Sequence, residues 1–119
     1  MREVDFGLLE GQTAEEIRAE HPEWFGSWQI GTAEAYPGGE TLAGFAARVA
    51  EGIDAIVQRH PDGDLLIVIH RGVIKMALGH LLGLTRSSVR SWSLDLGSVS
   101  IVVDDDRGGW TLERYNITG

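Results

Sequence analysis

The stretch LLIVIHRG, Leu65–Gly72, decides how the rest of the chain is interpreted. Its first five residues form an unbroken apolar run, which is typical of a β-strand covered on both faces. The next segment, GVIKMALGHLLGL, predicts a helix that ends near Gly83. A strand, a short loop and a helix in this order predict a parallel α/β unit.

His70, Arg71 and Gly72 stand at the junction of this strand and helix. Ligands of open α/β sheets bind beyond the carboxyl ends of strands, and a helix N-terminus favours phosphate. Gly72 lets the backbone approach an anion, Arg71 can clamp it, and His70 can act as donor, acid, base or nucleophile. A structural alternative stays open, because a histidine here can also bond a neighbouring carbonyl and close off the core.

Local signals predict the remaining elements. A capping box, Thr13 with Glu16, begins a short helix that Pro22 closes. Residues 23–40 are rich in aromatics and glycine without a period, and we interpret them as an irregular excursion. Thr41 is the candidate N-cap of a long helix with one apolar face: Leu42, Phe45, Ala46, Val49, Ile53, Ile56 and Val57. SVSIVVDDD and WTLERYN predict two strands joined by a hairpin turn.

Composition excludes several classes of function. A length of 119 residues predicts one domain, 1–119. Eighteen acidic against ten basic residues give a net charge of −8, which argues against nucleic-acid binding. Without cysteine there is no disulfide or thiol chemistry, and a cytoplasmic location fits. No apolar run is long enough to span a membrane, and MREVDFG is not a signal peptide.

No cofactor or metal is expected. No two histidines have the helical i, i+4 spacing of a zinc motif, and Asp104 to Asp106 predict a solvated turn. His21 and His60 each precede a proline at a predicted helix end, where a structural role near the helix dipole is expected.

Six motifs, in order from Arg2 to about Asn116, resemble the histidine phosphatase (phosphoglycerate mutase-like) family: REVDFGLLEG, AEEIRAEHPEWFGSW, YPGGETLAGFAARV, LLIVIHRGVIKMALGHLLGL, DLGSVSIVV and ERYN. The resemblance implies a three-layer α/β fold and a small phosphorylated metabolite as substrate. Each motif is weakly specific alone, but six in order and at plausible spacing are more specific.

The resemblance implies a set of site residues. His70 matches the second of the family's two essential histidines, which stabilises charge on the phosphoryl group. Glu3 matches the family's general acid, and Arg71 with the amides of Gly72 and Val73 would bind phosphate. The remaining implied residues form a lid over the substrate: Trp24, Trp28, Tyr36 and Glu40. The alternatives for these four are an aromatic cluster that holds the loop down and, for Glu40, a helix-dipole contact.

The chain also departs from the family pattern. It has no Arg-His-Gly motif, the motif that carries the nucleophilic histidine on the first strand. Arg71 replaces the glycine that usually follows the second histidine. The expected fold is therefore truncated at the N-terminus, with a small, mostly parallel sheet and a C-terminal hairpin. Open edges and apolar patches recruit partners, so we expect a homo-oligomer or a complementary chain.

Three classes of function remain, and whether the chain is an enzyme is left open. The first is action on a phosphomonoester in a site completed by a segment absent from these 119 residues. The second is a non-catalytic anion-binding or interaction domain. The third is a repurposed enzyme in which Glu3 and His70 act as an acid/base pair without phosphohistidine.

Overall fold

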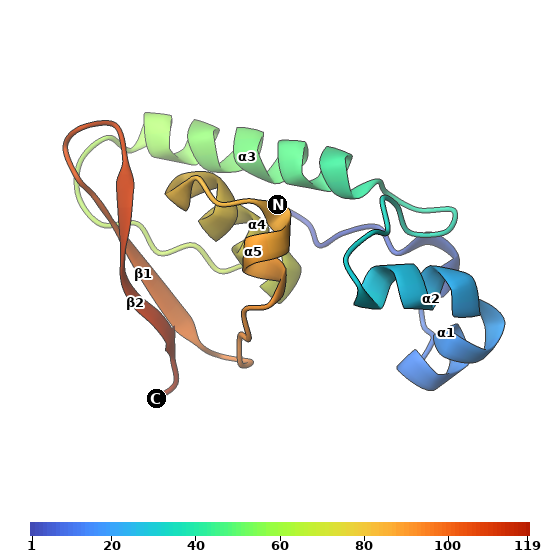
Figure 1. Cartoon of the computed structure of the whole chain (residues 1–119). Helices are drawn as coiled ribbons and strands as arrows, with labels where there is room; N and C mark the ends of the chain where they lie inside the picture. Colours follow the sequence, from blue (N-terminus) through green and yellow to red (C-terminus); the bar gives the residue numbers. More distant parts are fainter. The chain divides into compact units, whose positions relative to one another are not determined.

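Helices form most of the regular structure, and the only β-ladder is a C-terminal hairpin (Figure 1). The computed structural model describes residues 1–119. Its elements are, in order, η1 (Gly7–Leu9), α1 (Ala14–Glu20), α2 (Pro22–Gln29), α3 (Leu42–Arg59), α4 (Arg71–Leu82), α5 (Arg86–Arg90), β1 (Val99–Asp104) and β2 (Trp110–Ile117). None of the helices combines the length and apolar character needed to cross a bilayer.

Contacts within the chain define two units, which are described separately. The N-terminal unit is Val4–Arg48, and the C-terminal unit is Val49–Gly119 together with Met1–Glu3. The prediction of a single domain stays a prediction, because the two units are not placed relative to each other.

The start of α1 in the N-terminal unit confirms the predicted cap, since Thr13 Oγ1 accepts a hydrogen bond from the Glu16 amide at 3.2 Å. The irregular excursion predicted for residues 23–40 is wrong in its first part. Pro22 begins α2 rather than only ending α1, because its fixed φ suits the first position of a helix. Phe25 on this helix is buried, so the segment also contributes to the core.

Two loops of the N-terminal unit, residues 5–8 and 37–40, cross so closely that their backbones are hydrogen-bonded to each other. The Leu8 amide donates to the Pro37 carbonyl at 2.8 Å, and the Glu40 amide donates to the Asp5 carbonyl at 2.9 Å. Gly7 lies between these bonds with φ of 58°. A Cβ placed there would lie 2.3 Å from the Gly39 nitrogen, so the crossing has no room for a side chain.

The long helix α3 follows its sequence pattern. Thr41 Oγ1 accepts from the Gly44 amide at 3.0 Å, which confirms the predicted N-cap. Phe45, Val49 and Ile53, at spacings of four, are all less than 4% exposed, so the predicted apolar face is the buried one.

Helix α4 organises the C-terminal unit. Val73, Ala77 and Leu78 are buried along one side, and the helix ends as predicted, with Gly83 in the left-handed conformation at φ of 68°. The following short helix α5, which the sequence pattern did not predict, buries Val89. A Cβ on Gly79 would lie 3.4 Å from the Val89 side chain, so a small residue on α4 lets α5 pack closely.

The C-terminal hairpin confirms its prediction. Strands β1 and β2 pair antiparallel with Asp104 opposite Trp110. In the turn, Asp105 Oδ1 accepts from the amides of Arg107 and Gly109, and Asp104 Oδ1 accepts from Asp106. The acidic run therefore ties the turn together, as short polar side chains do.

The predicted parallel strand is wrong. Leu65–Ile69 joins no ladder, and the only sheet is the two-stranded antiparallel hairpin. Leu66 is 82% exposed and Val68 is 86% exposed, so the face they share is open. A strand needs partners for its backbone groups, and this chain supplies none beside this segment. The small, mostly parallel sheet is consequently not formed.

Candidate functional site

Glu3 and the start of α4 come together in the C-terminal unit although they are 69 residues apart. Glu3 Oε2 accepts a hydrogen bond from the Gly72 amide at 3.2 Å. A Cβ on Gly72 would lie 2.5 Å from Glu3 Oε1. Gly72 therefore does let the backbone approach an anion closely, and in this structure that anion is the Glu3 carboxylate.

His70 is the residue that precedes α4, in extended backbone geometry, and its carbonyl accepts from the Ile74 amide. Its side chain is exposed and makes no capping hydrogen bond. This arrangement does not favour the structural alternative, in which the histidine would close off the core. His70 is instead exposed, two residues before the Gly72 amide that binds Glu3.

Basic residues gather along the first turns of α4. Partial burial lowers the pKa of the Lys75 ammonium, and the charges of Arg71 and Arg90 lower it further. Arg71 is exposed, whereas Val73 is fully buried and its side chain belongs to the core. The start of α4 thus combines the Glu3 carboxylate, an exposed histidine and neighbouring cations.

Side chains of the motifs DLGSVSIVV and ERYN hydrogen-bond the end of β2 to the segment that precedes β1. Asn116 accepts from the Asp95 amide at 2.8 Å and donates to the Asp95 carboxylate. The Tyr115 hydroxyl donates to the Ser93 carbonyl. Burial, and then the charge of Asp95, raise the pKa of Tyr115. These residues fix the segment between α5 and β1.

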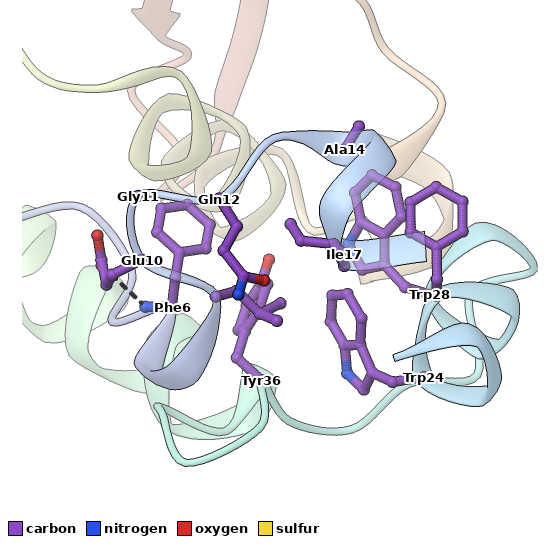
Figure 2. Close-up of a pocket in the computed structure, with 11 residues that line it drawn as sticks. Phe6, Glu10, Gly11, Gln12, Ala14, Ile17, Trp24, Trp28 and Tyr36 are labelled. Atoms are coloured by element: carbon purple, nitrogen blue, oxygen red, sulfur yellow. Dashed lines mark hydrogen bonds between the residues drawn. The ribbon is translucent and has the colours of Figure 1, made fainter. Parts of the chain in front are cut away.

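Three of the four predicted lid residues line one pocket of about 330 Å³ in the N-terminal unit (Figure 2). They are Trp24, Trp28 and Tyr36. The Trp24 ring lies 6.1 Å from the Trp28 ring and 5.5 Å from the Tyr36 ring, centre to centre. Trp24 Nε1 donates to the Ala35 carbonyl at 2.6 Å, which holds the indole in place. Their role as a lid over a substrate is untested, because the units are not placed relative to each other.

Glu40, the fourth predicted lid residue, does not line this pocket. Its carboxylate binds Arg48 through two contacts, at 2.9 and 3.0 Å, and accepts from the Asp5 amide at 3.1 Å. Such a two-point arginine contact is geometrically specific. These contacts brace the loop crossing.

Gln12 is a pocket residue that the sequence did not single out. Its amide nitrogen donates to Glu20 Oε2 at 2.8 Å, while its amide oxygen is buried without a partner. No local sequence pattern predicts that Gln12 lines a pocket, because the pocket forms only when η1, α1, α2 and Tyr36 pack together. His80, by contrast, pairs with Asp54 on α3 at 2.8 Å. No group of three or more potential ligands is placed to hold a metal ion.

A sequence model described as the histidine phosphatase superfamily (branch 1) matches residues 1–118. The chain belongs to the histidine phosphatase superfamily. This agrees with the resemblance inferred from the six motifs.

Individual relatives are similar over part of their own length. The chain is 29% identical over 117 residues to phosphoserine phosphatase 1 of Hydrogenobacter thermophilus, covering 98% of this chain and 55% of that protein. It is 28% identical over 116 residues to a probable phosphoglycerate mutase of Erwinia tasmaniensis, covering 97% and 54%. The chain therefore spans about half the length of these curated relatives.

The solved structure of the α-ribazole phosphatase from Shigella flexneri matches with a TM-score of 0.80 at 26% identity, covering 97% of this chain and 57% of that one. The match shows that this histidine phosphatase superfamily chain has part of a phosphoglycerate mutase-like fold. The missing parallel sheet is consistent with this partial coverage.

Proposed function

We propose that this chain supplies the acid and one histidine of a phosphomonoester-processing site, and that a further segment supplies the nucleophilic histidine. The observation that carries the proposal is the Glu3 carboxylate on the Gly72 amide, two residues after the exposed His70. In this proposal Glu3 protonates the leaving alcohol, and His70 stabilises charge on the phosphoryl oxygens. Arg71 and the amides of Gly72 and Val73 add to the phosphate contacts.

Two further observations support a site that is completed by another segment. The relatives are almost twice as long as this chain, which contains no Arg-His-Gly motif. In addition, Leu65–Ile69 runs into His70 without strand partners on either side. A polypeptide that pairs with this segment would bring its own residues to the end where His70 lies.

Association through this open segment is therefore expected, with a second copy or with a complementary chain. We expect sedimentation of the chain alone at tens of micromolar to show a dimer or larger species, because Leu66 and Val68 leave apolar surface in water. Replacing both by lysine should return the chain to a monomer, since charged side chains disfavour edge pairing.

The matched control is Ile30→Lys, which changes an apolar side chain that is 75% exposed in the N-terminal unit. This variant should associate as the unmodified chain does. A folded monomer for the unmodified chain at the same concentration would count against the expectation.

The test of the proposed function is phosphate release from an aryl phosphate. The chain is assayed alone and mixed with the part of the Hydrogenobacter relative that it does not cover. The family pattern predicts the Arg-His-Gly motif in that part. We expect release from the mixture only, and loss of that release with His70→Ala. Release by the chain alone that vanishes with His70→Ala would show that another group here replaces the missing nucleophile.

The two alternative functions predict different results in this assay. No release in any arm, with phosphate binding that depends on His70 or Arg71, would favour a non-catalytic anion-binding domain. Turnover of a substrate without phosphate that depends on Glu3 and His70 would favour an acid/base enzyme.

A further inference from the structure

The stretch Leu65–Leu94, which contains α4 and α5, has no acidic residue. This composition is unusual within the chain, because its 119 residues include 18 acidic residues and only ten lysines and arginines. The lysine and arginines of the stretch are Arg71, Lys75, Arg86 and Arg90. Positive charge is therefore concentrated on two consecutive helices of a chain whose net charge is −8.

Arg71, Lys75 and Arg90 form a group of neighbouring positive charges, which we call the cation cluster. Arg71 and Lys75 are four residues apart on α4, so they lie on the same face of this helix. Arg90 belongs to α5, which packs on α4 where the Val89 side chain lies against Gly79, four residues beyond Lys75. The charges of Arg71 and Arg90 both act on the Lys75 ammonium group.

The chain does not neutralise this cluster at its centre. Neither Arg71 nor Lys75 forms an ion pair with a carboxylate of the chain. Lys75 is partly buried, and this burial, followed by the charges of Arg71 and Arg90, lowers the pKa of its ammonium group. A negative charge placed nearby would have the opposite effect on that pKa. The charged ammonium group is thus in an unfavourable environment, which an anion from outside the chain would relieve.

The number of charges indicates the class of anion. Three cations around one partly buried position favour a ligand with several negative charges, because a single negative charge would leave part of the repulsion in place. The amide at the start of α4 does not supply the binding energy in this structure, because the Gly72 amide is hydrogen-bonded to the Glu3 carboxylate. The ligand would therefore be held by side chains of α4 and α5.

We propose that the cation cluster binds a small anion that carries two or more phosphate or carboxylate groups. Arg71 is the one residue that this site shares with the proposed phosphomonoester site, and Lys75 and Arg90 extend the positive surface beyond it. The site lies entirely within the C-terminal unit. The proposal concerns binding, and it does not require that the chain releases phosphate.

The test is isothermal titration calorimetry of the full chain at low ionic strength, with tripolyphosphate as the probe and orthophosphate as the comparison. We expect saturable binding of tripolyphosphate, and binding of orthophosphate that is at least about tenfold weaker, because orthophosphate has a single anionic group. Added sodium chloride should weaken tripolyphosphate binding, since exposed charges are screened by salt.

Lys75→Met tests the centre of the cluster. This variant should weaken tripolyphosphate binding about tenfold, because charge-assisted hydrogen bonds contribute on this scale. Methionine keeps an unbranched side chain and removes a partly buried charge, so the melting temperature without ligand should not fall. The matched control is Arg59→Met, at an exposed arginine of α3 outside the stretch, which removes the same single charge. It should bind tripolyphosphate within about twofold of the unmodified chain.

Three results would overturn the proposal. The first is no saturable binding of tripolyphosphate at low ionic strength, and the second is equal affinity for orthophosphate and tripolyphosphate. The third is an equal loss of affinity in Arg59→Met and Lys75→Met, which would show a response to net charge alone. The first two need no variant, so a folding defect in Lys75→Met cannot hide them. Phosphate release is not a readout, so failure here leaves the proposed function standing.

Discussion

Gly7→Ala should unfold the N-terminal unit at temperatures where the unmodified chain is folded. The Cβ would lie 2.3 Å from the Gly39 nitrogen and 2.4 Å from the Pro37 oxygen, and these are backbone atoms that cannot rotate away. The left-handed φ of 58° adds about 1–2 kcal/mol for a residue with a Cβ. Together we expect a loss of at least about 3 kcal/mol in the free energy of unfolding, a large share of a typical total.

The measurement is urea denaturation, combined with hydrogen exchange at the Leu8 and Glu40 amides that bond across the crossing. Gly11→Ala is the control, because Gly11 has a similar φ of 75° but nothing within 4 Å of an added Cβ. That variant should lose only about 1–2 kcal/mol. Equal losses in the two variants would mean that the crossing is more open than its contacts indicate.

Glu3→Gln should reduce turnover selectively for esters whose leaving alcohol needs a proton. In the mixture that releases phosphate, we expect a loss of roughly 10²- to 10³-fold for a simple alkyl phosphate, because general acid catalysis contributes on this scale. The loss should be small for 4-nitrophenyl phosphate, whose leaving group departs as an anion. His70→Ala should reduce both reactions, because it acts on the phosphoryl group in either case.

Glutamine is chosen because its side-chain oxygen can still accept from the Gly72 amide, so α4 keeps its cap. Glu10→Gln is the matched control within the same motif, since Glu10 accepts only the Phe6 amide among the contacts of this loop. Equal losses on both esters, or a comparable loss in Glu10→Gln, would assign Glu3 a structural role instead.

Sequence signals predicted the elements that depend on near neighbours. The Thr13 cap, the buried face of α3 and the end of α4 at Gly83 are each decided within four residues along the chain. The hairpin is local in the same sense, because its turn and both strands are contiguous. In each case the residues that carry the signal lie inside the element that they predict.

The features that the sequence mispredicted or missed depend mostly on contacts with residues far away in sequence or outside the chain. The apolar run Leu65–Ile69 has the composition of a central strand, but composition does not supply the neighbouring strands. Helix α2 was missed although Trp24, Phe25 and Trp28 have helical spacings of three and four and Pro22 followed by Glu23 is a start signal. The glycines and the proline within residues 26–39 are more typical of a loop and outweighed that signal. The free oxygen of Gln12 follows only from the assembled pocket.

Glu3 at the start of α4 also behaves as a tethered ligand. Because it belongs to the same chain, it occupies the Gly72 amide at an effective concentration on the order of millimolar, whatever the dilution of the protein. A free oxyanion that uses this amide must first outcompete the tethered carboxylate. The free energy of phosphate binding measured in solution would then be the difference between phosphate binding and Glu3 binding to this amide. It would underestimate the affinity of phosphate for a Gly72 amide that Glu3 does not occupy.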